Sequence, residues 1–392
     1  MKKIWIISGE ASGDIYGANL ARELKSIAAA NGEELELSGM GGAHMIAAGV
    51  NVLVDASELG VIGIFEVLGK IFTFIGVYLK LVREAKRQRP DAVVMVDYPG
   101  MNLRLAKALH KAGIPVVWYV SPQIWVWNKK RKPVLARVCS KMLVIFPFEV
   151  EVYAATKLDT EFVGHPLIDI IRERTDPAIK REGDTVLLLP GSRKLEIDRL
   201  LPPMLESVAE LAKRHPELKF HIAAPREKIA GMCRQMLEKF RRRHPDAPDI
   251  GMSVGDTGVW LQRAGSGIAS SGTVTVEAAI AGLPLVAGYR LHFFTLLIAA
   301  WMVKLYRGFF VMPNIIAGHE VYQEFLQWRF APKNLVPALE AILPGGSRRA
   351  EVEAGMNEVR TALSAESGNA AHQAAMSCWK VATRQQSSRG DG

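Results

Sequence analysis

Cysteine is scarce in this 392-residue chain, and the few that occur lie far apart. The three cysteines, Cys139, Cys233 and Cys378, are odd in number and share no close spacing. They provide neither a disulfide framework nor a cysteine metal cluster, and such usage is typical of a reducing compartment. The sequence also lacks an Asp-x-Asp pair and a histidine cluster. We therefore expect no metal and no cofactor.

A secretory signal is missing too. The opening "MKKIWIISGE" has an apolar run too short for a signal core but well suited to a first strand. The composition, 49% hydrophobic and 23% charged, is that of a folded protein. The formal net charge of +9 indicates an anionic partner, either nucleic acid, a phosphorylated substrate or an acidic membrane surface.

The first half repeats a short apolar run, a Gly/Pro/Ser turn and a helical pattern, as in "KIWIISGEASGDIYGANLARELK". Strands that alternate with amphipathic helices predict a doubly wound parallel α/β sheet. A charged break at 170–184 precedes a restart of the same pattern. We predict an N-terminal domain at 1–172, a C-terminal domain at 183–346, and a helical tail at 347–392 that returns to the first domain or meets a partner chain.

The turn after the first strand is no dinucleotide fingerprint, because "SGEASGDIYG" spaces its glycines by four. One interpretation is a tight strand-to-helix turn capped by Ser12. The other is a wall of a binding cleft, from which Glu10 and Asp14 reach substrate hydroxyls.

Two turns of the second half have the features of an anion site. In "LLLPGSRKLEIDRL" a Pro-Gly-Ser turn leads into a helix near Lys194, with Arg193 at its positive end. Open amides, helix dipole and guanidinium suit a phosphate, although a solvent-facing arginine is the alternative. "ASSGTVTVEAAIAGLPLV" repeats this device, with Glu277 one turn on, where a carboxylate can bind ribose hydroxyls. Together the two turns predict a nucleoside diphosphate site.

The stretch "VMPNIIAGHEVYQEFLQ" begins with a proline turn and predicts a loop followed by a helix. We expect Asn314 in the loop, and Glu320, Glu324 and Gln327 on one face of the helix. A solvated polar face explains these side chains as well as a binding role does.

Two long apolar segments, 61–82 and 291–310, carry charges that argue against a bilayer span. Core packing explains either alone. Both together, on a basic protein, favour reversible contact with anionic lipid. The run Lys129 to Lys132 beside Trp125 and Trp127 could stack bases. No nucleic-acid module surrounds it, so we predict a phosphate or lipid headgroup contact and no nucleic acid.

Eight motifs in order make the sequence resemble one enzyme family: "SGEASGD", "GIFEVL", "YVSPQIWVW", "FPFE", "GHPL", "LLPGSR", "SSGTVTVEAAIAGLPLVAGYR" and "PNIIAGHE". The family is that of the lipid-A-disaccharide synthases, inverting glycosyltransferases of the GT-B architecture. The resemblance implies two Rossmann-like domains facing an interdomain cleft. It also implies transfer of 2,3-diacylglucosamine from UDP to the 6-hydroxyl of 2,3-diacylglucosamine 1-phosphate. The products would be the β-1,6 lipid A disaccharide 1-phosphate and UDP.

The segment "DAVVMVDYPGMN" (91–102) ends an apolar strand on a carboxylate, Asp97. An inverting transfer needs a base, and a partly desolvated carboxylate has a raised proton affinity. The resemblance matches Asp97 to the first aspartate of the family's D-x-P-x-x-N loop; a simple helix cap is the alternative. Gly100 stands where the family usually has a second aspartate. The replacement removes a carboxylate that could compete with Asp97 for the role of base, and it also removes a possible substrate contact. Glu10 or Asn102 would orient Asp97.

The resemblance also implies the remaining site residues and partners. UDP contacts would come from Arg193, Ser271, Gly272, Thr273, Glu277 and Asn314, and we add Glu320 and Gln327. Acceptor-side candidates are Ser8, Glu10, Ser12, Asp14, Asn102, Ser121 and Trp127. The implied location is the cytoplasmic side of the inner membrane, with peripheral attachment to its anionic surface. The family's dimers suggest a homodimer, which nothing in the sequence decides.

Two other functions fit parts of this pattern. Another GT-B enzyme acting on a UDP sugar, such as a cell-wall glycosyltransferase or an epimerase, would share the donor turns but has no need of the two apolar segments. A two-lobed protein that closes on a phosphosugar without chemistry would share the cleft but have no turnover.

Overall fold

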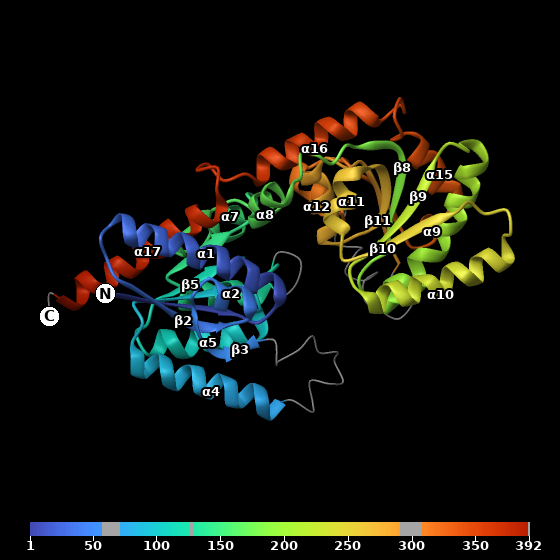
Figure 1. Cartoon of the computed structure of the whole chain (residues 1–392). Coiled ribbons are helices and arrows are strands. Elements are labelled where there is room, and N and C mark those ends of the chain that lie inside the picture. Colours follow the sequence, from blue (N-terminus) through green and yellow to red (C-terminus); the bar gives the residue numbers. More distant parts are fainter. Residues whose placement is uncertain (57–70, 125–128, 291–307, 391–392) are drawn as a thin grey trace. The chain divides into compact units, whose positions relative to one another are not determined.

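The computed structural model describes residues 1–56, 71–124, 129–290 and 308–390 of the chain (Figure 1). Its contacts divide it into two compact units. Unit 1 consists of Met1–Asp169 and Leu363–Gly392, and unit 2 consists of Ile170–Ala362. Each unit is built on one parallel sheet flanked by helices, which is the doubly wound α/β class predicted from the sequence.

Unit 1 has a seven-stranded sheet in the order β3-β2-β1-β4-β5-β6-β7. Its strands are β1 (Lys2–Ser8), β2 (Leu35–Gly41), β3 (Asn51–Asp55), β4 (Ala92–Val96), β5 (Val116–Tyr119), β6 (Lys141–Val144) and β7 (Thr160–Phe162). Its helices are α1 (Ala11–Ala30), α2 (Ala43–Ala47), α4 (Ile71–Gln88), α5 (Pro99–Lys111), α6 (Lys132–Val138), α7 (Glu149–Ala154) and α17 (Ala370–Gly390), with a 3-10 turn η2 (Lys129–Arg131).

The central strands of unit 1 are buried on both faces. All five residues of β4, "AVVMV", are buried, because α1 and α17 cover one face of the sheet while α4 and α5 cover the other (Figure 1). Trp5 and Trp118 fill the core under α4 and α5. A strand covered in this way has no solvent-facing positions, which explains its continuous apolar sequence.

Unit 2 has a six-stranded sheet in the order β10-β9-β8-β11-β12-β13. Its strands are β8 (Glu182–Leu189), β9 (Lys219–Ala224), β10 (Ile250–Val254), β11 (Ala264–Ser270), β12 (Leu285–Tyr289) and β13 (Gln323–Leu326). Its helices are α9 (Lys194–Arg214), α10 (Glu227–Arg243), α11 (Thr257–Arg263), α12 (Thr273–Ala281), α14 (Met312–Ala317), α15 (Pro332–Glu340) and α16 (Arg349–Leu363), with a 3-10 turn η3 (Gln327–Arg329). Helix α8 (Pro166–Arg174) carries the chain from unit 1 into unit 2.

The C-terminal tail is two helices that belong to different units. Helix α16 stays in unit 2, where Arg349 Nη1 donates to the carbonyl oxygens of Gly265 (2.7 Å) and Ile342 (3.0 Å). Helix α17 packs on α1 of unit 1, and its Trp379 ring lies 5.1 Å from Lys2 Nζ. The chain thus returns to its first unit at Leu363.

The apolar segments named above are only partly described. Helix α4 covers 71–82 of the first segment, whereas 57–70, 125–128 (with Trp127) and 291–307 lie outside the described residues. None of the described helices combines the length and the hydrophobicity needed to cross a bilayer.

Candidate active site

Asp97 follows β4 in a left-handed bend. Asp97 and Tyr98 have φ angles of 47° and 50°, a conformation that L residues adopt rarely. Two hydrogen bonds hold the Asp97 backbone: its N–H donates to the Tyr119 carbonyl (2.9 Å), and its carbonyl accepts from Asn102 Nδ2 (2.7 Å). Asn102 is fully buried and its side chain bonds the Asp97 carbonyl, so it fixes the bend and not the carboxylate itself.

The first glycine of the β1–α1 turn leaves room for this bend. A Cβ at Gly9 would overlap the Tyr98 ring. The turn and the bend follow β1 and β4, which are neighbours in the sheet, so they meet at its carboxyl edge. Gly9 is therefore required by the close approach of an aromatic ring.

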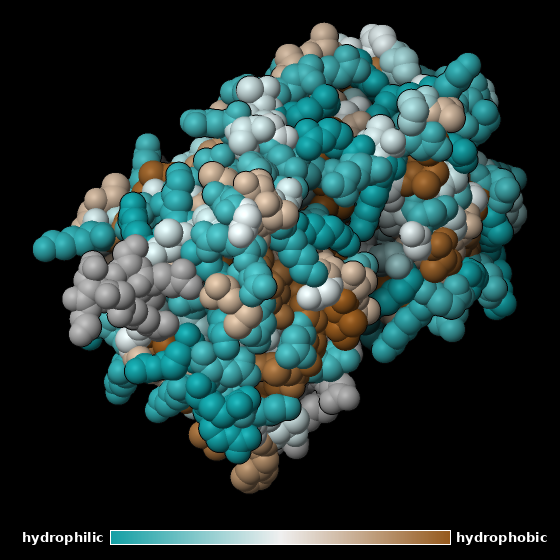
Figure 2. Space-filling view, turned by 60° about the vertical axis from the view of Figure 1, so that its left-hand side comes forward, coloured by the Kyte–Doolittle hydropathy of each residue, from teal (hydrophilic) through white to brown (hydrophobic). Residues whose placement is uncertain are grey.

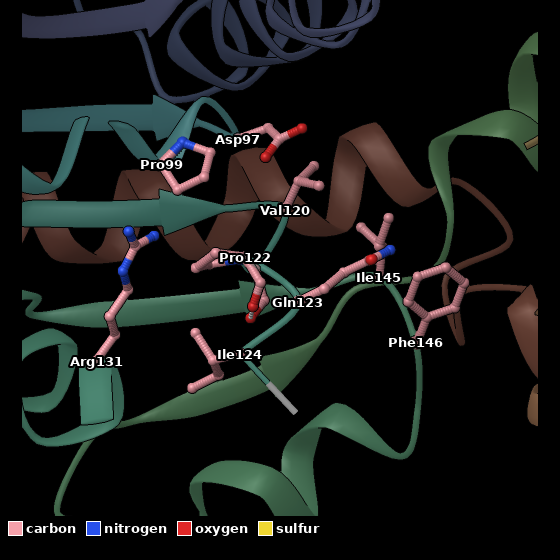
Figure 3. Close-up of a pocket in the computed structure, with 10 residues that line it drawn as sticks. Asp97, Pro99, Val120, Pro122, Gln123, Ile124, Arg131, Ile145 and Phe146 are labelled. Atoms are coloured by element: carbon pink, nitrogen blue, oxygen red, sulfur yellow. Dashed lines mark hydrogen bonds between the residues drawn. The ribbon is translucent and has the colours of Figure 1, made fainter. Parts of the chain in front are cut away.

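Asp97 opens into a pocket of about 610 Å³, called here the Asp97 pocket (Figure 3). Its lining comes from the ends of β4, β5 and β6 and from η2: Asp97, Pro99, Val120, Ser121, Pro122, Gln123, Ile124, Arg131, Ile145 and Phe146. Arg131 brings a positive charge from the basic run at 129–132 into this pocket. The sequence signal for it was that run, which we assigned to a phosphate or headgroup.

The pKa of Asp97 is raised from 3.8 to about 6, mainly by burial and secondarily by the nearby charge of Glu10, while a backbone hydrogen bond from Tyr98 opposes the rise. The direction is the one expected for a carboxylate at the end of a buried strand. A carboxylate with this pKa is mostly ionised at neutral pH and is basic enough to share a proton from an alcohol. Glu10 thus acts on Asp97 through its charge.

The structure corrects two expectations for the first turn, the substrate contact of Asp14 and the helix cap by Ser12. Asp14 is buried, and its carboxylate accepts hydrogen bonds from the amides of Gly42 (2.7 Å), His44 (3.0 Å) and Met45 (3.2 Å). It anchors the start of α2 and is not directed at a substrate. Ser12 does not cap α1, because the N-cap residue is Glu10 and no side chain forms a cap hydrogen bond.

The other acceptor-side serines are buried near the sheet edge. Ser8 Oγ donates to the Glu10 carbonyl (3.2 Å), so it stabilises the turn that carries Glu10. Ser121 lines the Asp97 pocket, and its hydroxyl shares a hydrogen bond of 3.0 Å with the Tyr153 hydroxyl. Of the two, Ser121 is the one that the structure places in the same pocket as Asp97.

A second pocket, of about 470 Å³, lies in unit 2 and is called here the Arg193 pocket. It brings together the two turns predicted to bind a nucleoside diphosphate, through Gly191, Ser192, Arg193, Ser270, Ser271, Gly272, Thr273 and Glu277. Ala223, Pro225 and Thr257, which lie outside the two predicted turns, also line it and were missed from the sequence. Thr257 begins α11 after a Gly-Asp turn, the same strand-turn-helix signal as at the two predicted turns.

The turn at Arg193 differs from the expected set of open amides. The Glu196 carboxylate accepts hydrogen bonds from the amides of Ser192 (2.8 Å) and Arg193 (3.2 Å), and it pairs with the Arg193 guanidinium at 3.2 Å. The expectation that both amides are open is therefore wrong, because a capping box satisfies them. The Arg193 side chain itself remains 79% exposed and lines the pocket.

The turn before α12 is as predicted, with helix α12 beginning at Thr273. The first turn of a helix leaves amides without intrahelical partners, and Gly272, Thr273 and Val274 of this turn line the pocket. Glu277 lies one turn further on in the same pocket, and burial raises its pKa against the opposing charge of Arg174. This end of the pocket combines the amides of a helix start with the Glu277 carboxylate.

The predictions for 312–327 need correction. Asn314 lies in α14 and not in a loop, and Glu320, Glu324 and Gln327 do not share a helical face. Gly318 ends α14 with a φ of 77°, and 323–326 forms the edge strand β13 beside β12. The spacings of four and three between these side chains suit a helix. The segment forms a strand instead, because it pairs with β12 at the edge of the sheet. Gln327 then enters η3 with a φ of 56°.

Asn314 is fully buried and uses both ends of its amide within the protein. Its Oδ1 accepts from the amides of Val321 (2.9 Å) and Tyr322 (2.8 Å), and its Nδ2 donates to the Tyr322 carbonyl (2.7 Å). Glu324 accepts from the amides of Phe310 (3.1 Å) and Val311 (2.9 Å). Glu320 pairs at 3.2 Å with Arg348, the residue before α16.

The described residues contain no group of three or more His, Cys, Asp or Glu side chains that could hold a metal ion. The chemistry that the structure offers comes from a carboxylate of raised pKa in one unit, and from a cation and helix amides in the other.

Comparison with known families identifies the group to which this architecture belongs. The family model described as lipid-A-disaccharide synthetase matches residues 4–378. The chain belongs to this family. It is 37% identical to the lipid-A-disaccharide synthase of Koribacter versatilis over 98% of its own length and all of the relative's. It is 34% identical to that of Anaeromyxobacter dehalogenans over 92% of its length and 93% of the relative's.

Solved structures with low sequence identity show the fold of this lipid-A-disaccharide synthase family member. A UDP-N-acetylglucosamine 2-epimerase from Neisseria meningitidis, bound to UDP-GlcNAc, aligns with a TM-score of 0.61 and 12% identity, covering 97% of this chain and 100% of the other. The glycotransferase of kitacinnamycin aligns with a TM-score of 0.60 and 16% identity, covering 97% and 98%. The two parallel-sheet domains therefore have the GT-B fold, as expected.

Proposed function

We propose that this enzyme transfers 2,3-diacylglucosamine from its UDP carrier to the 6-hydroxyl of 2,3-diacylglucosamine 1-phosphate, with inversion and with Asp97 as the general base. The products are the β-1,6 lipid A disaccharide 1-phosphate and UDP. Membership of the lipid-A-disaccharide synthase family supports the overall conversion. The local geometry of the two pockets supports the roles of individual residues.

The observation that carries the assignment of the base is Asp97 in its pocket. The acceptor hydroxyl must lose its proton as its oxygen attacks the sugar carbon and the bond to the diphosphate breaks. Asp97 is the carboxylate that lines the Asp97 pocket, and its pKa of about 6 suits proton transfer near neutral pH. The bend held by Asn102 and Tyr119 fixes the backbone from which this carboxylate extends.

The Arg193 pocket supports the donor side of the proposal. The departing UDP carries the electron pair of the broken bond as charge on its diphosphate. Arg193 and the amides of the first turn of α12 can stabilise that charge, and Glu277 can accept hydrogen bonds from the ribose hydroxyls. Glu196 already occupies two amides of the Arg193 turn, so we assign the diphosphate mainly to α12 and the guanidinium.

Helix α4 supports peripheral attachment to an anionic membrane on the cytoplasmic side. Phe72, Ile75 and Leu79 are 83%, 47% and 58% exposed, although they are large and apolar. Leu81 and Ala85 of the same helix pack into the core, so the helix is anchored while its outer side stays hydrophobic. A surface of this kind inserts favourably at the boundary of a lipid bilayer.

An assay of UDP release from UDP-diacylglucosamine with the acylated acceptor tests the proposal, and Asp97→Asn is the decisive variant. We expect turnover to fall by at least about a hundredfold, the usual contribution of a general base, with unchanged UDP binding in calorimetry. Retained turnover would exclude Asp97 as the base. A wild-type protein that binds UDP but never releases it from the donor would be a binding protein, and activity on non-acylated UDP sugars would indicate a different GT-B transferase or an epimerase.

A further inference from the structure

A groove of about 760 Å³ lies between α4 and α5 in unit 1; the proposed chemical step does not use it, although Ile75 and Leu79 of its lining also belong to the exposed side of α4 described above. We call it the α4–α5 groove. Helix α4 contributes Phe74, Ile75, Tyr78 and Leu79, which give it an apolar wall. Figure 2 shows hydrophobic residues gathered in the lower half of its view, the level at which α4 lies in Figure 1.

The opposite wall adds positive charge. Arg104, Lys107 and Lys111 lie along α5 at spacings of three and four, so they share one side of the helix, and all three line the groove and are exposed. Ala108 lies between them on the same wall. An apolar channel with a cationic rim fits an anionic lipid, whose chain can occupy the channel while its charge meets the rim.

The groove shares a wall with the Asp97 pocket. Along the turn 97–100, Asp97 and Pro99 line the Asp97 pocket, whereas Tyr98 and Gly100 line the groove. Gly100 adds no side chain to this boundary, and the space where its Cβ would lie holds no described atom within 4 Å. A ligand that presents a hydroxyl to Asp97 therefore has an apolar channel immediately behind the turn.

We propose that the α4–α5 groove is the subsite for an acyl chain of the acceptor lipid, and that it selects acceptors by chain length. This inference rests on the proposed function, because the acceptor must be an acylated sugar phosphate. Each methylene placed in an apolar site favours binding about fourfold. The groove should therefore separate long-chain from short-chain acceptors strongly.

The test compares long-chain with butyryl acceptors in the UDP-release assay, using Ala108→Trp to fill the groove. The matched control is His110→Trp, which adds the same indole to an exposed position of α5 outside the groove. We expect Ala108→Trp to lower the ratio of kcat/KM for long over short chains by about tenfold or more, and the control to keep the wild-type ratio. An acceptor with a photoreactive chain terminus should label peptides of α4 or α5 in the wild-type enzyme.

An unchanged ratio in an active Ala108→Trp enzyme, with label outside α4 and α5, would overturn the inference. The inference would also be overturned if Ala108→Trp left the kcat/KM ratio unchanged but weakened binding to anionic phospholipid vesicles. The groove would then hold a bilayer lipid. If the wild-type enzyme releases no UDP, the proposed function fails instead, which distinguishes the two failures.

Discussion

The acid side of the pH–rate profile is where the environment of Asp97 should be measurable. Its pKa rises from 3.8 to about 6, so the buried site disfavours the ionised carboxylate by about 3 kcal/mol relative to water. A base works in its ionised form, and the rate must therefore fall as the pH falls through this pKa. We expect kcat at pH 6 to be about half of its plateau value, and at pH 5 about one tenth.

Glu10→Gln separates the two causes of this shift. Burial is the larger cause and the charge of Glu10 the smaller, so the variant should move the acid limb to lower pH without bringing it to 3.8. Glu34→Gln is the matched control, because Glu34 precedes β2 at the amino edge of the same sheet, opposite the edge that carries Asp97. The measurement is kcat at saturating substrate over a pH series, with circular dichroism to exclude acid unfolding. A wild-type profile flat from pH 8 to pH 5, or a limb that Glu10→Gln moves upward, would refute the reasoning.

Three further substitutions probe separate parts of the structure. Arg193→Ala should weaken UDP binding by about tenfold in calorimetry, because a charge-assisted contact is lost. The control Lys194→Ala, at an exposed neighbouring position, should have little effect. Equal losses in the two variants would mean that only the net charge matters. Gly9→Ala should lower the free energy of unfolding, measured by urea denaturation, by about 1–3 kcal/mol, because the added methyl group meets the Tyr98 ring. The control Gly231→Ala, whose methyl group meets open space within α10, should be neutral or stabilising. Asn314→Ala should destabilise by about 1–3 kcal/mol per amide left unpaired, and a change below 0.5 kcal/mol would mean that water replaces those bonds.

The fold was predictable because its signals are local. Strands such as 92–96 are continuous apolar runs, and each is followed by turn residues and an amphipathic helix, so alternation alone indicates a doubly wound sheet. Asp97 was found for the same reason, as a charge at the end of a buried strand. The two turns of the Arg193 pocket were also visible, since Pro-Gly-Ser and Ser-Ser-Gly mark where strands become helices.

The errors arose where distant residues decide the outcome. Asp14 was assigned to a substrate because its partners, the amides at 42, 44 and 45, come 28 to 31 residues later. Glu324 was placed on a helix because its segment becomes a strand only by pairing with β12. The place of Arg131 in the Asp97 pocket was not predicted either, because it depends on the sheet bringing the chain after β5 beside the end of β4. None of these contacts leaves a periodic trace in the sequence.

The bend at Asp97 and Tyr98 links the position of the base to the position of the groove. Two successive left-handed residues cost about 1–3 kcal/mol each, so the bend persists only where other contacts hold it. The backbone bonds to Tyr119 and Asn102 and the space left by Gly9 supply those contacts. If the bend relaxed to an extended strand, the side chains of Asp97 and Tyr98 would exchange sides, and the Asp97 carboxylate would leave its pocket. Loss of Asn102 should therefore lower kcat and the selectivity for long-chain acceptors together, whereas a residue that served only the base would change kcat alone.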